Sequence, residues 1–369
     1  MDYRHQQIQD CFFNTCKQHG MINVDPTPLL AMHDNSVYFV SATITGLKDM
    51  LLKNEIPNNG VYLYQPCFRL QNIHDPFYNG TKIKYPGYFN MLATLVPAQS
   101  IVKLQQIIVD IMDQQGIARN RIKLNTTKKE PLLIKDLQNY YEAEYDTRPE
   151  KSYNWTYGMG DDIHGKGMTF YIRQNTGEYK RLGQYVIIYN KDTPIAAEYG
   201  WGIEVFLART KCYSNEYDAF AIAPILSKYG FDVNFTNEHV FSSAAATYST
   251  GLSMNHNPGR NHRQNVRYVI RNLVFLKDRD KLSDEQISSV LKEYSIVEFG
   301  NDKYVKEIMT DLHDQEKVLA SQKDKVRSFI NNPQNKNKTP IQIEKKLQDL
   351  YPFYSQYMML IKQNQKESL

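Results

Sequence analysis

A chain of 369 residues is long enough to form two domains of ordinary size, each with its own hydrophobic core. Hydrophobic residues make up 41% of the sequence and charged residues 23%, and no apolar run approaches the ~18 residues of a membrane span, which argues against a membrane-embedded protein. The four cysteines are too few and too scattered for a disulfide framework or a zinc finger, so we predict no metal site. The N-terminal stretch MDYRHQQIQDCFF has an early acid and a helical pattern unlike a signal peptide, which favours a cytoplasmic protein.

Strands dominate the elements predicted for the first part of the chain, after an opening helix. β-Branched and aromatic residues predict strands in SVYFVSAT (36–43) and VYLYQPCFRL (61–70). The apolar spacing of SIVKLQQIIVDIMDQQG (100–116) predicts an amphipathic helix that ends at its glycine. YKRLGQYVIIYNKDTPIAAEYG (179–200) predicts a pair of strands joined by a turn at residues 191–192.

The second part of the chain is predicted to be helical. Capping boxes predict helix starts at Ser283 and at Thr339, each with a glutamine three residues further on. Strands followed by helices in blocks, rather than in alternation, indicate an α+β fold with a mainly antiparallel sheet and an appended all-helical domain. We place the two domains at residues 1–213 and 214–369.

Basic residues are in excess only in the last third of the chain. From residue 251 onward there are 20 Lys and Arg against 15 Asp and Glu, and before it 24 against 25. Arg263, Arg267 and Arg271 recur at every fourth position, shortly after Arg260, and the opposite face of the predicted helix is apolar. Such a cationic stripe suits an RNA phosphate backbone, although an ordinary solvated helix face has the same pattern.

A Gly-x-Gly pair, Gly200 and Gly202, stands where a predicted strand meets a predicted helix. On its own such a pair mostly makes a turn or lets two backbones pack closely, so its neighbours decide its meaning. The stretch around it, AEYGWGIEVFLAR (197–209), is one of three that together resemble a known family.

The three stretches resemble, in order, motifs 1, 2 and 3 of class II aminoacyl-tRNA synthetases, and in particular of the alanyl-tRNA synthetase catalytic core. Motif 1 corresponds to SVYFVSATITGLKDMLLK (36–53), and motif 2 to YLYQPCFRLQNI (62–73) followed by YPGYFNML (85–92). Motif 3 corresponds to residues 197–209. NEHVFSSAAATYSTGL (237–252) and the arginine helix resemble the family's region that reads the tRNA acceptor stem, so the likeness runs to about residue 280.

The resemblance implies a role for each motif residue. Arg69 would neutralise charge on the α-phosphate of ATP, which makes it the catalytic cation of the site. The family stacks adenine on the residue that corresponds to Phe89, which without the motif is an ordinary core aromatic. Gly200 and Gly202 would leave room for a nucleotide against the backbone. Glu198 replaces the family's aspartate that receives the ammonium group of the substrate. Two further residues are assigned to substrate binding, Trp155 and Tyr185.

The sequence departs from the family at the residues for the outer phosphates. Val205 stands where motif 3 has an arginine, and Tyr85 where motif 2 has an arginine or histidine. Thr169 takes the place of an acid, and Gly183 that of an asparagine on the strand that discriminates substrates. Arg209, one helical turn after Val205, is our candidate for replacing the lost cation.

Two functions follow from this pattern. The first is a ligase that activates a small amino acid with ATP and Mg²⁺ and transfers it to tRNA or another acceptor. The second is a binding, transfer or regulatory protein that no longer uses ATP and recognises an aminoacyl-adenosine group or charged tRNA. The histidine spacing of the family's editing domain is missing, so this would be a synthetase-like core without proofreading.

Overall fold

The structure, a computed structural model, divides the chain into two compact units. It describes residues 2–31, 37–69, 86–127, 130–145, 154–156, 159–160, 162–256, 259–335, 338–339, 342–343 and 345–347. The sheet unit comprises Met1–Arg69 and Tyr88–Pro224, and the helical unit comprises Leu70–Gly87 and Ile225–Leu369. The predicted boundary lies between residues 213 and 214, whereas the structure divides the chain after Pro224.

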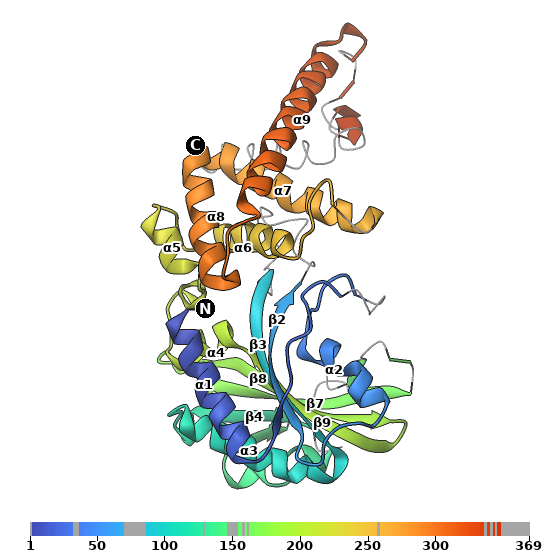
Figure 1. The fold of residues 1–369 in the computed structure, drawn as a ribbon, viewed down its shortest axis with the longest axis vertical. Helices are drawn as coiled ribbons and strands as arrows, with labels where there is room; N and C mark the ends of the chain where they lie inside the picture. The colour runs from blue at the N-terminus through green and yellow to red at the C-terminus, as the bar shows by residue number, and fades with distance from the viewer. Residues whose placement is uncertain are drawn as a thin grey trace. The chain divides into compact units, whose positions relative to one another are not determined.

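The described residues of the sheet unit form one sheet of nine strands in the order β1-β2-β3-β9-β8-β7-β4-β5, with β6 paired to β7 (Figure 1). All pairings are antiparallel except those of β1 with β2 and β4 with β5. The strands are β1 Ile22–Asn23, β2 Val61–Phe68, β3 Tyr88–Pro97, β4 Ile122–Thr126, β5 Glu142–Tyr145, β6 Asn154–Thr156, β7 Ile163–Arg173, β8 Tyr179–Asn190 and β9 Thr193–Gly202. This mainly antiparallel sheet flanked by helices confirms the predicted fold class.

Helices lie on both faces of the sheet. The bounds are α1 Tyr3–Gln18, α2 Thr43–Leu52, α3 Ile101–Gln114 and α4 Ile203–Thr210. One face, called the α3 face, packs against α1, α3 and α4 and includes Phe12, Leu92 and Trp201 in a single core. The other face, called the α2 face, is covered in part by α2. Leu47 of this helix and Leu63 of β2 belong to the same core there. Because side chains alternate along a strand, every strand residue belongs to one of these two faces.

The predicted helix at 100–116 and the predicted strand pair are confirmed. In α3 the apolar residues Ile101, Leu104 and Ile108 are buried, and Gly116 follows the helix with φ +70°, a left-handed conformation that suits glycine. Strands β8 and β9 pair from Gln184 with Gly200 to Asn190 with Thr193, and the turn between them falls at residues 191–192 as predicted.

The strand predicted at 36–43 is wrong over the part that the structure describes. Phe39 forms only an isolated bridge with Leu30, and α2 already begins at Thr43. Phe39 and Val40 are nevertheless buried, and the backbone of Val40 bonds to Leu29 and Phe68. The apolar run therefore serves burial, with too few ladder bonds to make a strand.

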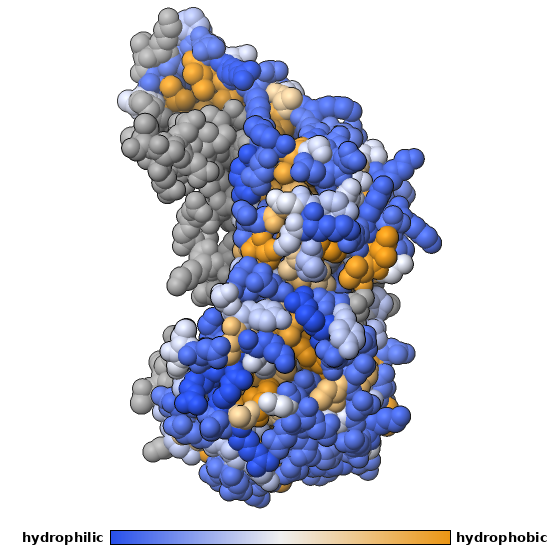
Figure 2. Space-filling view, turned by 90° about the vertical axis from the view of Figure 1, so that its left-hand side faces the viewer, coloured by the Kyte–Doolittle hydropathy of each residue, from blue (hydrophilic) through white to orange (hydrophobic). Residues whose placement is uncertain are grey.

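The helical unit contains α6 Phe235–Ser249, α7 Arg260–Asp280, α8 Asp284–Phe299 and α9 Val305–Asn331, and α5 Ala223–Lys228 crosses the boundary of the units. Both predicted capping boxes are present, at Ser283 with Gln286 and at Thr339 with Gln342. On the face drawn in Figure 2, hydrophilic residues predominate and hydrophobic ones form separate patches. Among the residues described, no helix has the length and apolar character to span a bilayer.

Candidate functional site

Beyond the part that α2 covers, the α2 face of the sheet is half-exposed, and we call this half-exposed part the floor. Glu198, Gly200 and Gly202 alternate along β9 on this face and are half-buried, whereas the residues between them are buried on the α3 face. A β-carbon at Gly200 would lie 3.1 Å from the Ala93 β-carbon and from the Leu92 carbonyl oxygen. A side chain at Gly200 would therefore crowd β3, while a β-carbon at Gly202 would meet nothing nearer than 3.6 Å.

Arg69 and Phe89 lie together at one end of this floor. Phe89 is on β3 opposite Cys67, and Arg69 follows the last residue of β2. The Arg69 guanidinium carbon lies 4.7 Å from the centroid of the Phe89 ring, and its Nε–H donates to the Ser41 carbonyl oxygen at 3.1 Å. Arg69 and Phe89, which both belong to the stretches that resemble motif 2, are thus in contact, with the cation on the face of the aromatic ring.

A buried hydrogen-bond network fixes the start of β3, and the sequence did not predict it. The Glu204 carboxyl, only 2% exposed, accepts from the Asn90 backbone N–H at 3.0 and 3.2 Å and from Asn90 Nδ2 at 3.2 Å. Asn90 Oδ1 in turn accepts from the hydroxyls of Tyr64 at 2.7 Å and Tyr88 at 3.2 Å. Glu204, the acid two residues after Gly202, therefore anchors helix α4 to the residue next to Phe89.

Trp155 lies at the opposite end of the floor. Strand β6 pairs with β7, and the Trp155 ring stacks over Gly167, where no β-carbon would fit. The sheet register continues this row from Gly167 to Val186 and from Val186 to Glu198. Trp155 itself pairs with Gly165, so its ring reaches from the neighbouring row over the row that contains Glu198.

Gln184 is a site residue that the sequence analysis missed. It is half-buried on the α2 face, directly opposite Gly200 on one side and Thr169 on the other. Gly183, interpreted as the changed discriminating position, is buried on the α3 face, where a β-carbon would lie 3.2 Å from the Gly200 carbonyl oxygen. Residues that pair across neighbouring strands point to the same face of a sheet. Once the pairing of Gln184 with Gly200 is known, Gln184 can therefore be assigned to the face of Glu198 and Gly200.

Tyr185 belongs to the core, which corrects its assignment to a substrate pocket. Its side chain is fully buried on the α3 face, its hydroxyl donates to the Ile101 carbonyl oxygen at 3.4 Å, and it accepts from Gln105 at 3.4 Å. Burial raises the pKa of the Tyr185 hydroxyl, a shift that the Gln105 hydrogen bond opposes. Strand alternation explains the difference, because Tyr185 follows Gln184 and therefore points to the other face.

Arg209 is engaged away from Arg69 and Phe89. It donates to the Arg181 carbonyl oxygen, and its Nη2 lies 3.2 Å from a carboxylate oxygen of Glu216, in the 3₁₀ helix η7 (Glu216–Ala219). Lys180 contacts the same carboxylate at 2.8 Å. Arg209 is thus held by β8 and η7, and Tyr85, the other changed phosphate position, lies outside the described residues.

The predicted arginine helix forms, and its apolar face is buried. Val266, Ile270 and Leu273 of α7 have no exposed surface. Arg263 is exposed and Arg267 half-buried, while the side chain of Arg260 lies outside the described residues.

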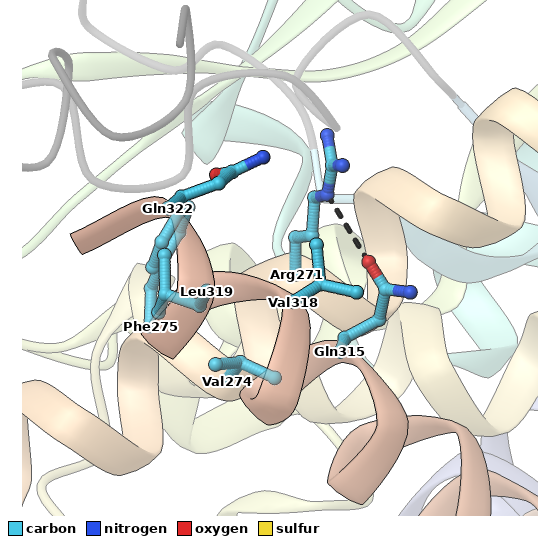
Figure 3. Close-up of a pocket in the computed structure, with 7 residues that line it drawn as sticks. All are labelled: Arg271, Val274, Phe275, Gln315, Val318, Leu319 and Gln322. Atoms are coloured by element: carbon cyan, nitrogen blue, oxygen red, sulfur yellow. Dashed lines mark hydrogen bonds between the residues drawn. The ribbon is translucent and has the colours of Figure 1, made fainter. Parts of the chain in front are cut away.

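Arg271 differs from the arginines before it on the stripe, because it reaches across to α9. Its Nε–H donates to Gln315 Oε1 at 3.3 Å, over a groove lined by residues of α7 and α9 such as Phe275 and Gln322 (Figure 3). Burial, reinforced by the nearby Arg267, lowers the pKa of the Arg271 guanidinium. The exposed part of the stripe is therefore its N-terminal part.

No group of three or more His, Cys, Asp or Glu side chains within the described ranges could hold a metal ion.

The chain matches no protein-family model and no curated protein. The solved structures with a similar fold include two aminoacyl-tRNA synthetases. For an aspartyl-tRNA synthetase from Entamoeba histolytica, the match has 12% identity and a TM-score of 0.35, and covers 59% of this chain and 57% of that protein. For PylSc, a pyrrolysyl-tRNA synthetase from Desulfitobacterium hafniense, the values are 11%, 0.33, 55% and 67%. At such low scores and identities, neither neighbour assigns this chain an activity, a substrate or a partner.

Proposed function

We propose that the half-exposed floor of the α2 face binds an aminoacyl adenylate, and that the chain is an alanyl-tRNA synthetase-like ligase. It would activate a small amino acid with ATP and Mg²⁺ and transfer the acyl group to tRNA or another acceptor. The observation that carries this proposal is the arrangement along the floor. Arg69 and Phe89 stand at one end and Glu198 at the other, with Gly200 and Gly202 between them on the same face.

The length of the floor suits an extended ligand. Glu198 pairs with Leu95 of β3, which is six residues from Phe89 on the same strand. At ~3.3 Å per residue the two ends are about 20 Å apart, before their side chains lean towards each other. A free amino acid is too short to contact both ends, whereas a nucleotide joined to an aminoacyl group is long enough.

In the proposed adenylation reaction, each end of the floor has a different role. A carboxylate oxygen of the amino acid attacks the α-phosphorus of ATP, the mixed anhydride forms, and pyrophosphate leaves. The Arg69 guanidinium would neutralise the charge that builds on the α-phosphate oxygens, while Phe89 stacks the adenine. Glu198 would hold the ammonium group, and Trp155 over Gly167 would limit the size of the side chain.

Replacing Arg69 with alanine should lower amino-acid-dependent pyrophosphate exchange by at least ~100-fold, as is typical for the loss of one preorganised charge contact. The matched control is Arg119→Ala, which removes an exposed arginine that lies 4.9 Å from the Tyr140 ring, outside the floor. Exchange at the wild-type rate in a folded Arg69→Ala protein would exclude this site assignment.

The second candidate function is binding without ATP activation, and the contacts of Arg209 favour it. Position 205 has a valine in place of the motif 3 arginine, and Arg209, its candidate replacement, is held by Glu216, so neither position offers a cation to the outer phosphates. Melting temperatures separate the two candidates. Stabilisation by ATP with magnesium supports the ligase, and stabilisation by an aminoacyl-adenylate analogue alone supports the binding protein.

We further propose the tRNA acceptor stem as the partner of helix α7. Each arginine that meets a phosphate releases counterions, so Arg263→Ala should flatten the plot of log K against log salt by about one unit. The matched control is Arg279→Ala, on the same helix but paired with Asp280 at 2.6 Å. Binding of an acceptor-stem minihelix across salt concentrations measures both slopes. Equal slopes for wild type and Arg263→Ala would mean that this helix face is merely solvated.

A further inference from the structure

The Arg69 guanidinium covers the ring that the proposed function reserves for adenine. Phe89 is only 5% exposed, and the guanidinium lies on its ring at 4.7 Å, a cation–π distance. A planar base stacks on an aromatic ring at van der Waals contact, so it needs the same place. Adenine and the guanidinium cannot both occupy that face of the ring.

Phe89 is the fixed member of this pair. The next residue, Asn90, is 2% exposed and is bound to the Glu204 carboxyl through both its backbone N–H and its side-chain amide. Phe89 itself lies within the ladder between β2 and β3, opposite Cys67. The backbone that carries the ring therefore cannot shift without breaking buried hydrogen bonds, which is costly, and the ring, being buried itself, has little room to turn.

Arg69 is the movable member. It lies one residue beyond the end of β2 and is half-buried, and its Nε–H bonds to a backbone carbonyl of Ser41. Its long side chain can turn about several bonds without disturbing the strand. When the two compete with a ligand for space, Arg69 moves and Phe89 stays.

We propose that Arg69 gates the adenine position, so that the site selects adenosine 5′-phosphates over adenosine. This inference rests on the proposed function. A phosphate at the 5′ position offers the guanidinium a charge-assisted, bidentate partner, stronger than its contact with the ring. Adenosine has no phosphate, so it must displace the guanidinium without giving it a new partner.

The gate predicts that removing Arg69 changes the affinities for adenosine and AMP in opposite directions. In Arg69→Ala and in Arg69→Gln, adenosine should bind about 3- to 10-fold more tightly, because the cation–π contact no longer competes. AMP should bind at least ~10-fold more weakly, because the charged partner of its phosphate is lost. Calorimetric titration of each ligand into wild type and both variants measures the four changes.

A control variant and two contrary outcomes distinguish a gating role of Arg69 from a general loss of ligand binding. Arg119→Ala, which also takes a cation off an aromatic ring, should leave both affinities unchanged. If both Arg69 variants bind adenosine no better than wild type, the gate is excluded while the proposed site stands. If wild type binds neither AMP nor an aminoacyl-adenylate analogue, the proposed function fails, and the gate fails with it.

Discussion

Replacing Glu204 with alanine should lower the free energy of unfolding by roughly 3 kcal/mol. The change removes the acceptor of the Asn90 backbone N–H and side-chain amide, both of which are buried and would be left without that partner. Glu204→Gln should cost less, since one amide oxygen can still accept from the Asn90 backbone. Urea unfolding monitored by circular dichroism gives the order wild type, glutamine variant, alanine variant.

The matched control for Glu204 is its neighbour on α4. Val205 is half-buried and next to the network without belonging to it, so Val205→Ala should change the unfolding free energy by less than ~1 kcal/mol. An alanine variant at Glu204 as stable as Val205→Ala would show that the Asn90 contacts contribute little to the fold.

Stability should fall between about pH 5 and pH 8 because of Glu238 in helix α6. Burial raises the pKa of its carboxyl from 4.5 to about 8, an effect that the Ser242 hydroxyl partly opposes. The folded state therefore holds a proton that the unfolded state releases above pH 4.5. The stabilisation is fully present below that pH and is lost as the pH rises through 8, about 5 kcal/mol in all.

Glu238→Gln removes this proton and with it the pH dependence. The variant should be more stable than wild type at pH 8 and lack the decline, in urea unfolding measured at several pH values. Exposed Glu285 on α8 provides the control, because Glu285→Gln should retain the wild-type decline. A Glu238→Gln protein whose stability still falls over the same range would place the titrating group elsewhere.

Local patterns predicted most of the fold because each depends on residues close together in the chain. Three features depend only on residues a few positions apart in the chain: the apolar spacing of α3, the turn between β8 and β9, and the capping box at Ser283. The motif stretches likewise brought Arg69 and Phe89 to attention before their contact was known.

The parts that escaped prediction depend on pairing between distant strands. Glu204 and Asn90 are 114 residues apart in the chain, and no local signal links an acid in one motif to an amide in another. The choice between Gln184 and Tyr185 depends on which face of the sheet each points to, which the register sets and the sequence of β8 alone does not. A mistake of one position moves a residue from the floor into the core.

Because of its position, Trp155 can also serve as an intrinsic fluorescent probe of the floor. The chain has two tryptophans, and Trp201 is buried in the core between Phe12 and Phe206, with ring centroids 5.2 and 5.1 Å away. Trp201→Phe keeps an aromatic ring in that core and leaves Trp155 as the one indole. The ultraviolet emission of such a protein would then come from the edge of the floor, where the Trp155 ring covers Gly167, and the emission wavelength would report whether water or a ligand lies beside that ring.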